Sequence, residues 1–114
     1  MALQTELDTF RTSWEARVGE QIAAMMTGDI EVLRHSGLLE RAAKPGDLLP
    51  HAPGLVDSHG APFDLATLAA SVPTIITFYR GGWCPYCNIE LRAYQALLPD
   101  IHAAGGQLVA ISPE

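Results

Sequence analysis

The chain of 114 residues has little that points to export, to a membrane or to a nucleic acid. It has only two cysteines, and its 7 Lys and Arg residues are outnumbered by 13 Asp and Glu residues. The formal net charge of -6 repels phosphate groups, which argues against nucleic acid and anionic membranes as partners. No segment approaches the roughly 18 consecutive apolar residues that cross a bilayer, and the N-terminus does not have the pattern of a signal peptide. We therefore expect a cytoplasmic protein.

The composition is nevertheless that of a folded domain. Hydrophobic residues make up 48% of the chain and charged residues 18%, so it can bury a core. Aromatic residues are sparse at 7%, which indicates a core built mainly from aliphatic side chains. The length suits a single domain of ordinary size.

Residues 1–43 are expected to form a helical N-terminal arm. Apolar residues recur there at the three- and four-residue intervals of one helix face, namely at Leu3, Leu7, Phe10, Trp14, Val18, Ile22 and Met25. We expect this helix to end at Gly28 and Asp29 to cap a second, shorter helix from Ile30 to about Leu39. The apolar face should pack on the rest of the fold or on a second copy of the chain.

Residues 44–114 are expected to form an α/β unit. Prolines and glycines between residues 44 and 54 exclude a long helix and mark the joint with the arm. We expect a short strand at residues 55–56, a turn in which Gly60 has a positive φ, and a short helix capped by Asp64.

The rest of this unit reads as strand, helix and strand. Residues 74–79 are β-branched or aromatic, which predicts a strand buried on both faces, and a glycine pair ends it. A helix should begin near Pro85, and Pro99 should kink or end it before a second buried strand at residues 108–112. A strand, a crossover helix and a strand in this order predict parallel pairing.

The two cysteines, Cys84 and Cys87, stand three residues apart where the strand leads into this helix. The positive end of a helix favours a thiolate, and a second thiol one turn further along could resolve a disulfide formed at the first. Arg80 could add a positive charge beside the sulfur, and Trp83 could shield one side of it. The pair therefore predicts a thiol–disulfide redox centre.

Two other interpretations of this cysteine pair stay open. The pair could supply two zinc ligands, although zinc usually takes four, and the four histidines of the chain are scattered without ligand spacing. The cysteines could also be inert core residues, although the flanking Gly, Pro and Trp residues indicate a loop. We expect no metal and no cofactor.

The run FYRGGWCPYCNIELR at residues 78–92 resembles the peroxiredoxin-like, or redoxin, branch of the thioredoxin superfamily. This branch includes the alkyl hydroperoxide reductase and thiol-specific antioxidant proteins. Further segments agree in order: Gly46, Asp47 and Pro50 resemble the entry to the family's first strand, residues 57–65 its turn and short helix, and residues 108–113 its next strand. The resemblance covers roughly residues 44–114.

This resemblance implies an antioxidant thiol–disulfide oxidoreductase, with a hydroperoxide or disulfide as substrate and a thiol or thioredoxin-type reductant. In typical members the attacking cysteine follows a proline by seven residues and a threonine by three. Counted back from Cys87, those positions hold Arg80 and Cys84. The order of the two cysteines stays open, and we favour Cys84 as the attacking residue, Cys87 as the resolving residue, and Arg80, Trp83 and Pro85 as supporting residues.

The resemblance also implies a thioredoxin-like fold that is incomplete in this chain. A whole domain of this kind has two further strands and a final helix, so we expect its C-terminal half to be absent. Free strand edges invite pairing, which predicts either a fragment of a longer protein or a homodimer or higher oligomer. A redox-silent assembly module is the alternative to the enzyme.

Overall fold

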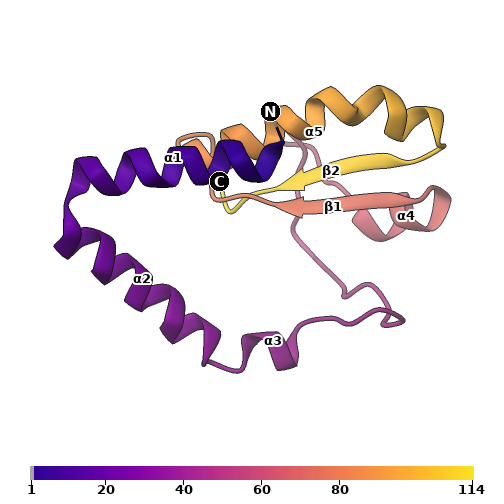
Figure 1. Cartoon of the computed structure of the whole chain (residues 1–114). Coiled ribbons are helices and arrows are strands. Elements are labelled where there is room, and N and C mark those ends of the chain that lie inside the picture. The colour runs from indigo at the N-terminus through magenta and orange to yellow at the C-terminus, as the bar shows by residue number, and fades with distance from the viewer. Residues whose placement is uncertain (1) are drawn as a thin grey trace. The chain divides into compact units, whose positions relative to one another are not determined.

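The structure is a computed structural model and describes residues 2–114. The chain divides into two compact units, one ending at Leu48 and the other comprising Leu49–Glu114. Figure 1 shows helices in the first unit and a mixture of helices and strands in the second. This arrangement confirms the expected α/β fold with a helical N-terminal region and two parallel strands, which is part of a thioredoxin-like fold.

The first unit contains α1 (Leu3–Val18), α2 (Glu20–Arg34) and α3 (Leu38–Arg41). The predicted end of the first helix at Gly28 is wrong, because the break comes at Gly19, whose φ of 87° lies in the region that favours glycine. Gly28 lies inside α2, where its φ is not positive, so it continues the helix at a modest cost.

The second predicted helix also has wrong bounds. Asp29 is not a cap, because it lies within α2, and so does Ile30, where this helix was expected to begin. A left-handed turn at Gly37 then separates α2 from the single turn of α3. The apolar residues expected on the α1 face are half-buried, and none of the residues of α1, α2 or α3 is fully buried.

The second unit begins with a turn around Asp57. Val56 forms one isolated antiparallel bridge with Pro62, so the strand predicted at residues 55–56 is only a bridge. The Asp57 carboxylate accepts hydrogen bonds from the backbone N–H groups of His59 at 2.8 Å and Ala61 at 3.0 Å. Gly60 has the predicted positive φ, 82°, which lets the chain reverse direction there.

Helix α4 (Leu65–Ser71) begins where the sequence predicts. Asp64 precedes it in an extended conformation and accepts a hydrogen bond from the Thr67 backbone N–H, so the expected N-cap is confirmed. Leu65, the first residue of the helix, is buried, with 5% of it exposed.

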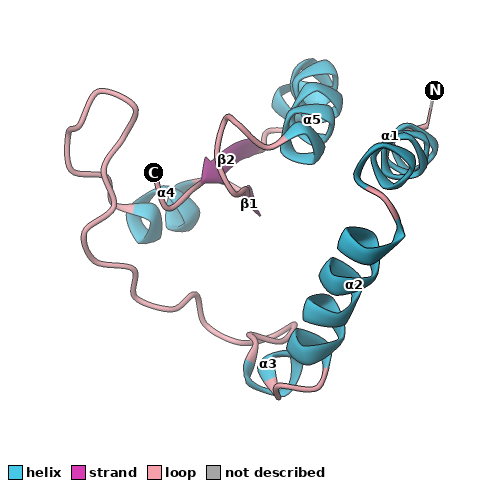
Figure 2. Ribbon diagram, turned by 90° about the vertical axis from the view of Figure 1, so that its left-hand side faces the viewer, coloured by secondary structure: helices cyan, strands magenta, loops and turns pink. Residues whose placement is uncertain are grey.

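The sheet consists of β1 (Thr74–Phe78) and β2 (Gln107–Ile111), joined by α5 (Pro85–Ala103). The strands are parallel, as predicted, with Thr74 aligned with Gln107 and Phe78 with Ile111. Figure 2 shows α4 and α5 on opposite sides of the strands. The parallel pairing brings the C-terminal ends of both strands to the same edge as the start of α5.

Helix α5 continues through Pro99 to Ala103, so this proline does not end it, and the other expected outcome, a kink, stays a prediction. The predicted burial of the first strand is wrong. Strand β1 is not buried on both faces, because 49% of Ile75 and 74% of Phe78 are exposed. Within residues 2–114 the sheet has two strands, and no third strand covers β1. None of the helices formed by these residues is long and apolar enough to cross a membrane.

Candidate redox site

The segment between β1 and α5 holds both cysteines. Tyr79 extends the sheet by one hydrogen bond, from its backbone N–H to the carbonyl of Ile111 at 3.0 Å. The chain then turns, and the N–H of Cys84 donates to the carbonyl of Gly81 at 3.1 Å. This turn makes Cys84 the N-cap of α5, with Pro85 as the first helical residue. Proline is favourable there, because the first N–H groups of a helix have no partner within it.

Gly81 occupies a position that only glycine fits. Its φ is 150°, and a Cβ at this residue would lie 2.5 Å from the indole nitrogen of Trp83 and 2.6 Å from a carboxylate oxygen of Glu114. The next residue, Gly82, has no atom within 4 Å of its Cβ position. The first glycine therefore allows close packing of the turn, and the second leaves open space beside it.

Both cysteines are free thiols and both are buried, with 1% of Cys84 and 7% of Cys87 exposed. Cys87 lies on α5, one turn after the N-cap position that Cys84 occupies. The two residues are therefore neighbours at the start of one helix.

Opposing effects set the pKa of Cys84. Burial alone would raise this pKa, but attraction to the backbone N–H and thiol of Cys87, to the Arg80 charge and to the Tyr86 N–H outweighs it. The pKa of Cys84 is consequently lower than its ordinary value of 9.0. Two of these groups, the N–H groups of Tyr86 and Cys87, belong to the first turn of α5, where backbone N–H groups have no partner within the helix. A lower pKa favours the nucleophilic thiolate.

Arg80 contacts both cysteines in different ways. Its backbone N–H donates to the sulfur of Cys87 at 3.4 Å, while its charge contributes to the low pKa of Cys84. Its guanidinium carbon lies 4.7 Å from the centroid of the Trp83 ring, which is a cation–π distance. Trp83 itself is 60% exposed. These residues lie with Pro85 in the segment from the end of β1 to the first turn of α5, and their predicted roles stay predictions.

Asn88 is a residue that the sequence reasoning missed. Its side-chain amide donates to the carbonyl of Gly82 at 2.9 Å and so ties the turn to the first turn of α5. The sequence could have predicted this bond, because the side chain of an asparagine near a helix start commonly forms a hydrogen bond with a nearby backbone group. Further along α5, the hydroxyl of Tyr94 donates a hydrogen bond to the carboxylate of Glu90 at 2.5 Å. This bond to a carboxylate raises the pKa of Tyr94 above 10.0.

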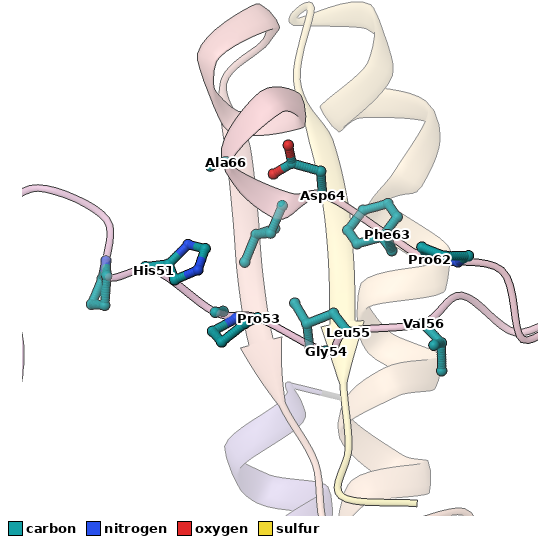
Figure 3. Close-up of a pocket in the computed structure, with 12 residues that line it drawn as sticks. His51, Pro53, Gly54, Leu55, Val56, Pro62, Phe63, Asp64 and Ala66 are labelled. Atoms are coloured by element: carbon teal, nitrogen blue, oxygen red, sulfur yellow. The ribbon is translucent and has the colours of Figure 1, made fainter.

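Two openings of this unit lie away from the cysteines. A cavity of about 480 Å³ lies between residues 50–56 and 62–66, and Figure 3 shows His51, Phe63 and Asp64 around it, in front of the strands. A second hollow of about 660 Å³ follows β2 and includes Tyr79 and Glu114. Neither is lined by Cys84 or Cys87, so neither is a preformed substrate pocket for these thiols.

The side chains of residues 2–114 form no group of three or more His, Cys, Asp or Glu that could hold a metal ion. The two cysteines therefore have no additional ligands beside them in this part of the chain.

A dithiol at the start of a helix that follows a parallel strand defines a thiol-based redox protein of thioredoxin-like type. Residues 45–114 match the model of the AhpC/TSA family, which is more than half of the chain. The chain therefore belongs to the AhpC/TSA family, in the redoxin branch of the thioredoxin superfamily. No curated protein and no solved structure gives a comparable match.

Proposed function

We propose that the chain is a thiol–disulfide oxidoreductase, with peroxidase activity, in which Cys84 attacks the substrate and Cys87 resolves the product. Membership of the AhpC/TSA family assigns it to thiol-based redox chemistry in general. The redox domain would comprise residues 44–114 and the helical arm residues 1–43. The two free thiols suit a reducing, cytoplasmic environment.

The lowered pKa of Cys84 at the N-cap of α5 is the observation that carries this proposal. A thiolate is the form of cysteine that attacks peroxides and disulfides. Cys87 is held beside it by the first turn of the helix, and its sulfur accepts a hydrogen bond from Arg80. The position of each sulfur relative to the helix start supports Cys84 as the attacking and Cys87 as the resolving residue.

With a hydroperoxide, the Cys84 thiolate attacks the terminal oxygen, so that an S–O bond forms and the O–O bond breaks. The alkoxide leaves and takes up a proton as an alcohol, and Cys84 becomes a sulfenic acid. The sulfur of Cys87 then attacks Cys84, an S–S bond forms, and water leaves with the thiol proton. An external dithiol returns both cysteines to thiols and is itself oxidised to a disulfide.

With a disulfide substrate, the Cys84 thiolate attacks one sulfur and displaces the other as a thiolate. The resulting mixed disulfide is broken when Cys87, after losing its proton, attacks the sulfur of Cys84. The second half of the substrate leaves as a thiol, so the substrate disulfide has become two thiols, and the chain retains the Cys84–Cys87 disulfide. The same reductant closes the cycle, so both substrates use one pair of residues.

Steady-state turnover of a hydroperoxide and of a small disulfide, with dithiothreitol as reductant, tests this proposal. The wild-type chain should turn over at least one of them, and Cys84→Ser should abolish turnover. Cys87→Ser should lose multiple turnover with a disulfide while still releasing one equivalent of thiol. Absence of turnover in the wild-type chain with both substrates would support the redox-silent assembly module instead.

A further inference from the structure

The side chain of Glu114 lies against the turn that leads into α5. The aligned pair at the end of the sheet is Phe78 of β1 and Ile111 of β2. Gly81 and Glu114 each stand three residues beyond this pair, on the two segments that leave the same edge of the sheet. The parallel pairing therefore brings together two residues that are far apart in the sequence.

Gly81 is the point where two side chains meet. This glycine is buried, although it lies in a loop. The atoms nearest to its Cβ position are the indole nitrogen of Trp83 at 2.5 Å and a carboxylate oxygen of Glu114 at 2.6 Å. Because both atoms lie close to one point, the carboxylate is a near neighbour of the indole N–H. These two groups occupy the space that a side chain would fill at Gly81.

The Trp83 ring meets opposite charges on two of its sides. An indole has a negatively polarised face and a positively polarised edge, which includes the N–H donor. The guanidinium carbon of Arg80 lies over the ring, 4.7 Å from its centroid, and the carboxylate of Glu114 lies beside the ring nitrogen. Each charge therefore attracts the part of the ring that it faces. Since 60% of Trp83 is exposed, these polar contacts orient the ring more than packing does.

The orientation of this ring bears on Cys84 through Arg80. The positive charge of Arg80 is one of the causes of the lowered pKa of Cys84, and Glu114 is not one of them. The negative charge of Glu114 would act in the opposite direction, because a carboxylate close to a thiol raises the pKa of that thiol. An effect of Glu114 that favours the thiolate must therefore pass through Trp83 and Arg80.

We propose that Glu114 is a positioning residue for the attacking thiol: its carboxylate holds the edge of the Trp83 ring, and this ring holds the Arg80 guanidinium beside the sulfur. This role rests on the proposed function, because it requires Cys84 to be the attacking residue. It couples the segment after β2 to the reactivity of a residue at the start of α5. Glu114 acts through other side chains and so is not itself a catalytic residue.

The pH dependence of Cys84 alkylation by iodoacetamide tests this role, with the full chain in a Cys87→Ser background. Iodoacetamide is uncharged, so the charge of Glu114 does not steer it. Glu114→Ala should move the alkylation profile to higher pH and slow alkylation about twofold at neutral pH, the size expected when one exposed cation–π contact is weakened. Glu114→Gln should retain most of the wild-type profile, because its amide oxygen can still accept the indole N–H.

A purely electrostatic effect of Glu114 would have the opposite sign. Both Glu114→Ala and Glu114→Gln remove the negative charge, so that effect alone would move both profiles to lower pH by similar amounts. The positioning role also requires Arg80. In an Arg80→Gln background, Glu114→Ala should therefore cause no further shift to higher pH.

Asp100→Ala is the matched control for the loss of a carboxylate. Asp100 is exposed and lies about 24 Å further along α5 than Cys84, beyond the range of screened charges. This variant should leave the alkylation profile unchanged.

The fluorescence of Trp83 reports on the ring itself. In a Trp14→Phe background Trp83 is the one remaining tryptophan, and Glu114→Ala should increase the quenching of its emission by acrylamide. Unchanged quenching would show that Glu114 does not hold the ring and would overturn the proposal.

A Glu114→Ala alkylation profile that stays unchanged or moves to lower pH would also overturn it, and so would equal shifts in Glu114→Ala and Glu114→Gln. Alkylation and quenching do not depend on turnover, so their failure is distinct from failure of the proposed function. Absence of turnover in the wild-type chain would contradict the proposed function, whereas Cys84-dependent turnover with an alkylation profile that ignores Glu114 would contradict the positioning role alone.

Discussion

The guanidinium of Arg80 stacks on the indole ring of Trp83, with its carbon 4.7 Å from the ring centroid. This contact matters because the charge of Arg80 is one of the causes of the low pKa of Cys84, and the same residue donates its backbone N–H to Cys87. The exposed tryptophan thus holds a positive charge close to a buried sulfur. A stacked arginine also loses less freedom than a lone one when it acts on the thiolate.

The role of Arg80 is tested by two replacements. Arg80→Gln removes the charge and should raise the pKa of Cys84, because one of the stabilising effects on the thiolate is lost. Arg80→Lys keeps the charge but loses the planar stacking, so its effect should be smaller. The pH dependence of alkylation of Cys84 by iodoacetamide, in a Cys87→Ser background, measures the pKa of Cys84 in both variants. Equal alkylation profiles for all three proteins would show that Arg80 has no electrostatic role.

The low pKa of Cys84 also makes the stability of the reduced chain depend on pH. The pKa of Cys84 is about 9.0 in the unfolded chain and lower in the folded chain. The thiolate therefore stabilises the folded state fully when the pH is above the unfolded-state pKa, and this contribution is lost as the pH falls through the folded-state pKa. The free energy of unfolding of the wild type, relative to Cys84→Ser, should therefore rise with pH over that window. Urea denaturation of both proteins with reductant present measures this difference in the free energy of unfolding. A difference that falls as the pH rises would contradict a lowered pKa of Cys84.

Gly81 and Gly82 provide a matched pair of substitutions. Gly81→Ala should lower the free energy of unfolding and shift the Trp83 fluorescence, because its Cβ would meet the indole and the Glu114 carboxylate in a backbone conformation that L residues avoid. Gly82→Ala, with open space at its Cβ position, should change both quantities little. A neutral Gly81→Ala would mean that the turn adopts another conformation in solution.

Much of the redox segment could be predicted from the sequence, because local rules specify it. Asp64 caps α4 since short acidic side chains accept helix N–H groups, and Pro85 starts α5 since its missing N–H costs nothing there. The strand, helix and strand order determined parallel pairing. For the two helix starts the deciding interaction lies within a few residues, and for the strands the order of elements decides the pairing.

The wrong predictions arise where several local solutions compete. Both Gly19 and Gly28 could have ended the first helix, and only the structure shows that Gly19 takes the positive φ. Pro99 removes one hydrogen bond from α5, yet the helix continues to Ala103, and the sequence pattern alone did not decide whether the proline would end it. The apolar composition of β1 predicted burial of Ile75 and Phe78, yet burial depends on distant elements that composition does not specify.

The cap of α4 gives a prediction about acid stability. The hydroxyl of Thr67 donates to Asp64 at 2.6 Å and its backbone N–H at 3.2 Å, and these bonds lower the pKa of that carboxyl. The ionised Asp64 carboxyl should stabilise the folded state fully when the pH is above 3.8, the ordinary pKa of this group, and this contribution should be lost as the pH falls through the folded-state pKa. Asp64→Ala should lower the free energy of unfolding at neutral pH, and Asp64→Ser should retain much of it without the pH dependence.

Asn88 is expected to stabilise the turn that carries Cys84. Asn88→Ala removes the hydrogen bond to the Gly82 carbonyl and should lower the free energy of unfolding by about 1 kcal/mol, the usual net value of one such bond. Gln4→Ala, which removes an exposed amide–carboxylate bond in α1, is the control and should have a smaller effect. Hydrogen exchange of the Cys84 N–H should accelerate in Asn88→Ala and remain unchanged in the control.

Trapping of the mixed disulfide tests the central claim, the division of roles between Cys84 and Cys87, most directly. Single-cysteine variants Cys87→Ser and Cys84→Ser would each be mixed with an aromatic disulfide near neutral pH, and the modified residue would be identified and timed by mass spectrometry. The account predicts rapid, stable labelling of Cys84 in Cys87→Ser and much slower labelling of Cys87 in Cys84→Ser. Faster labelling of Cys87 would contradict it and would reverse the attacking and resolving roles.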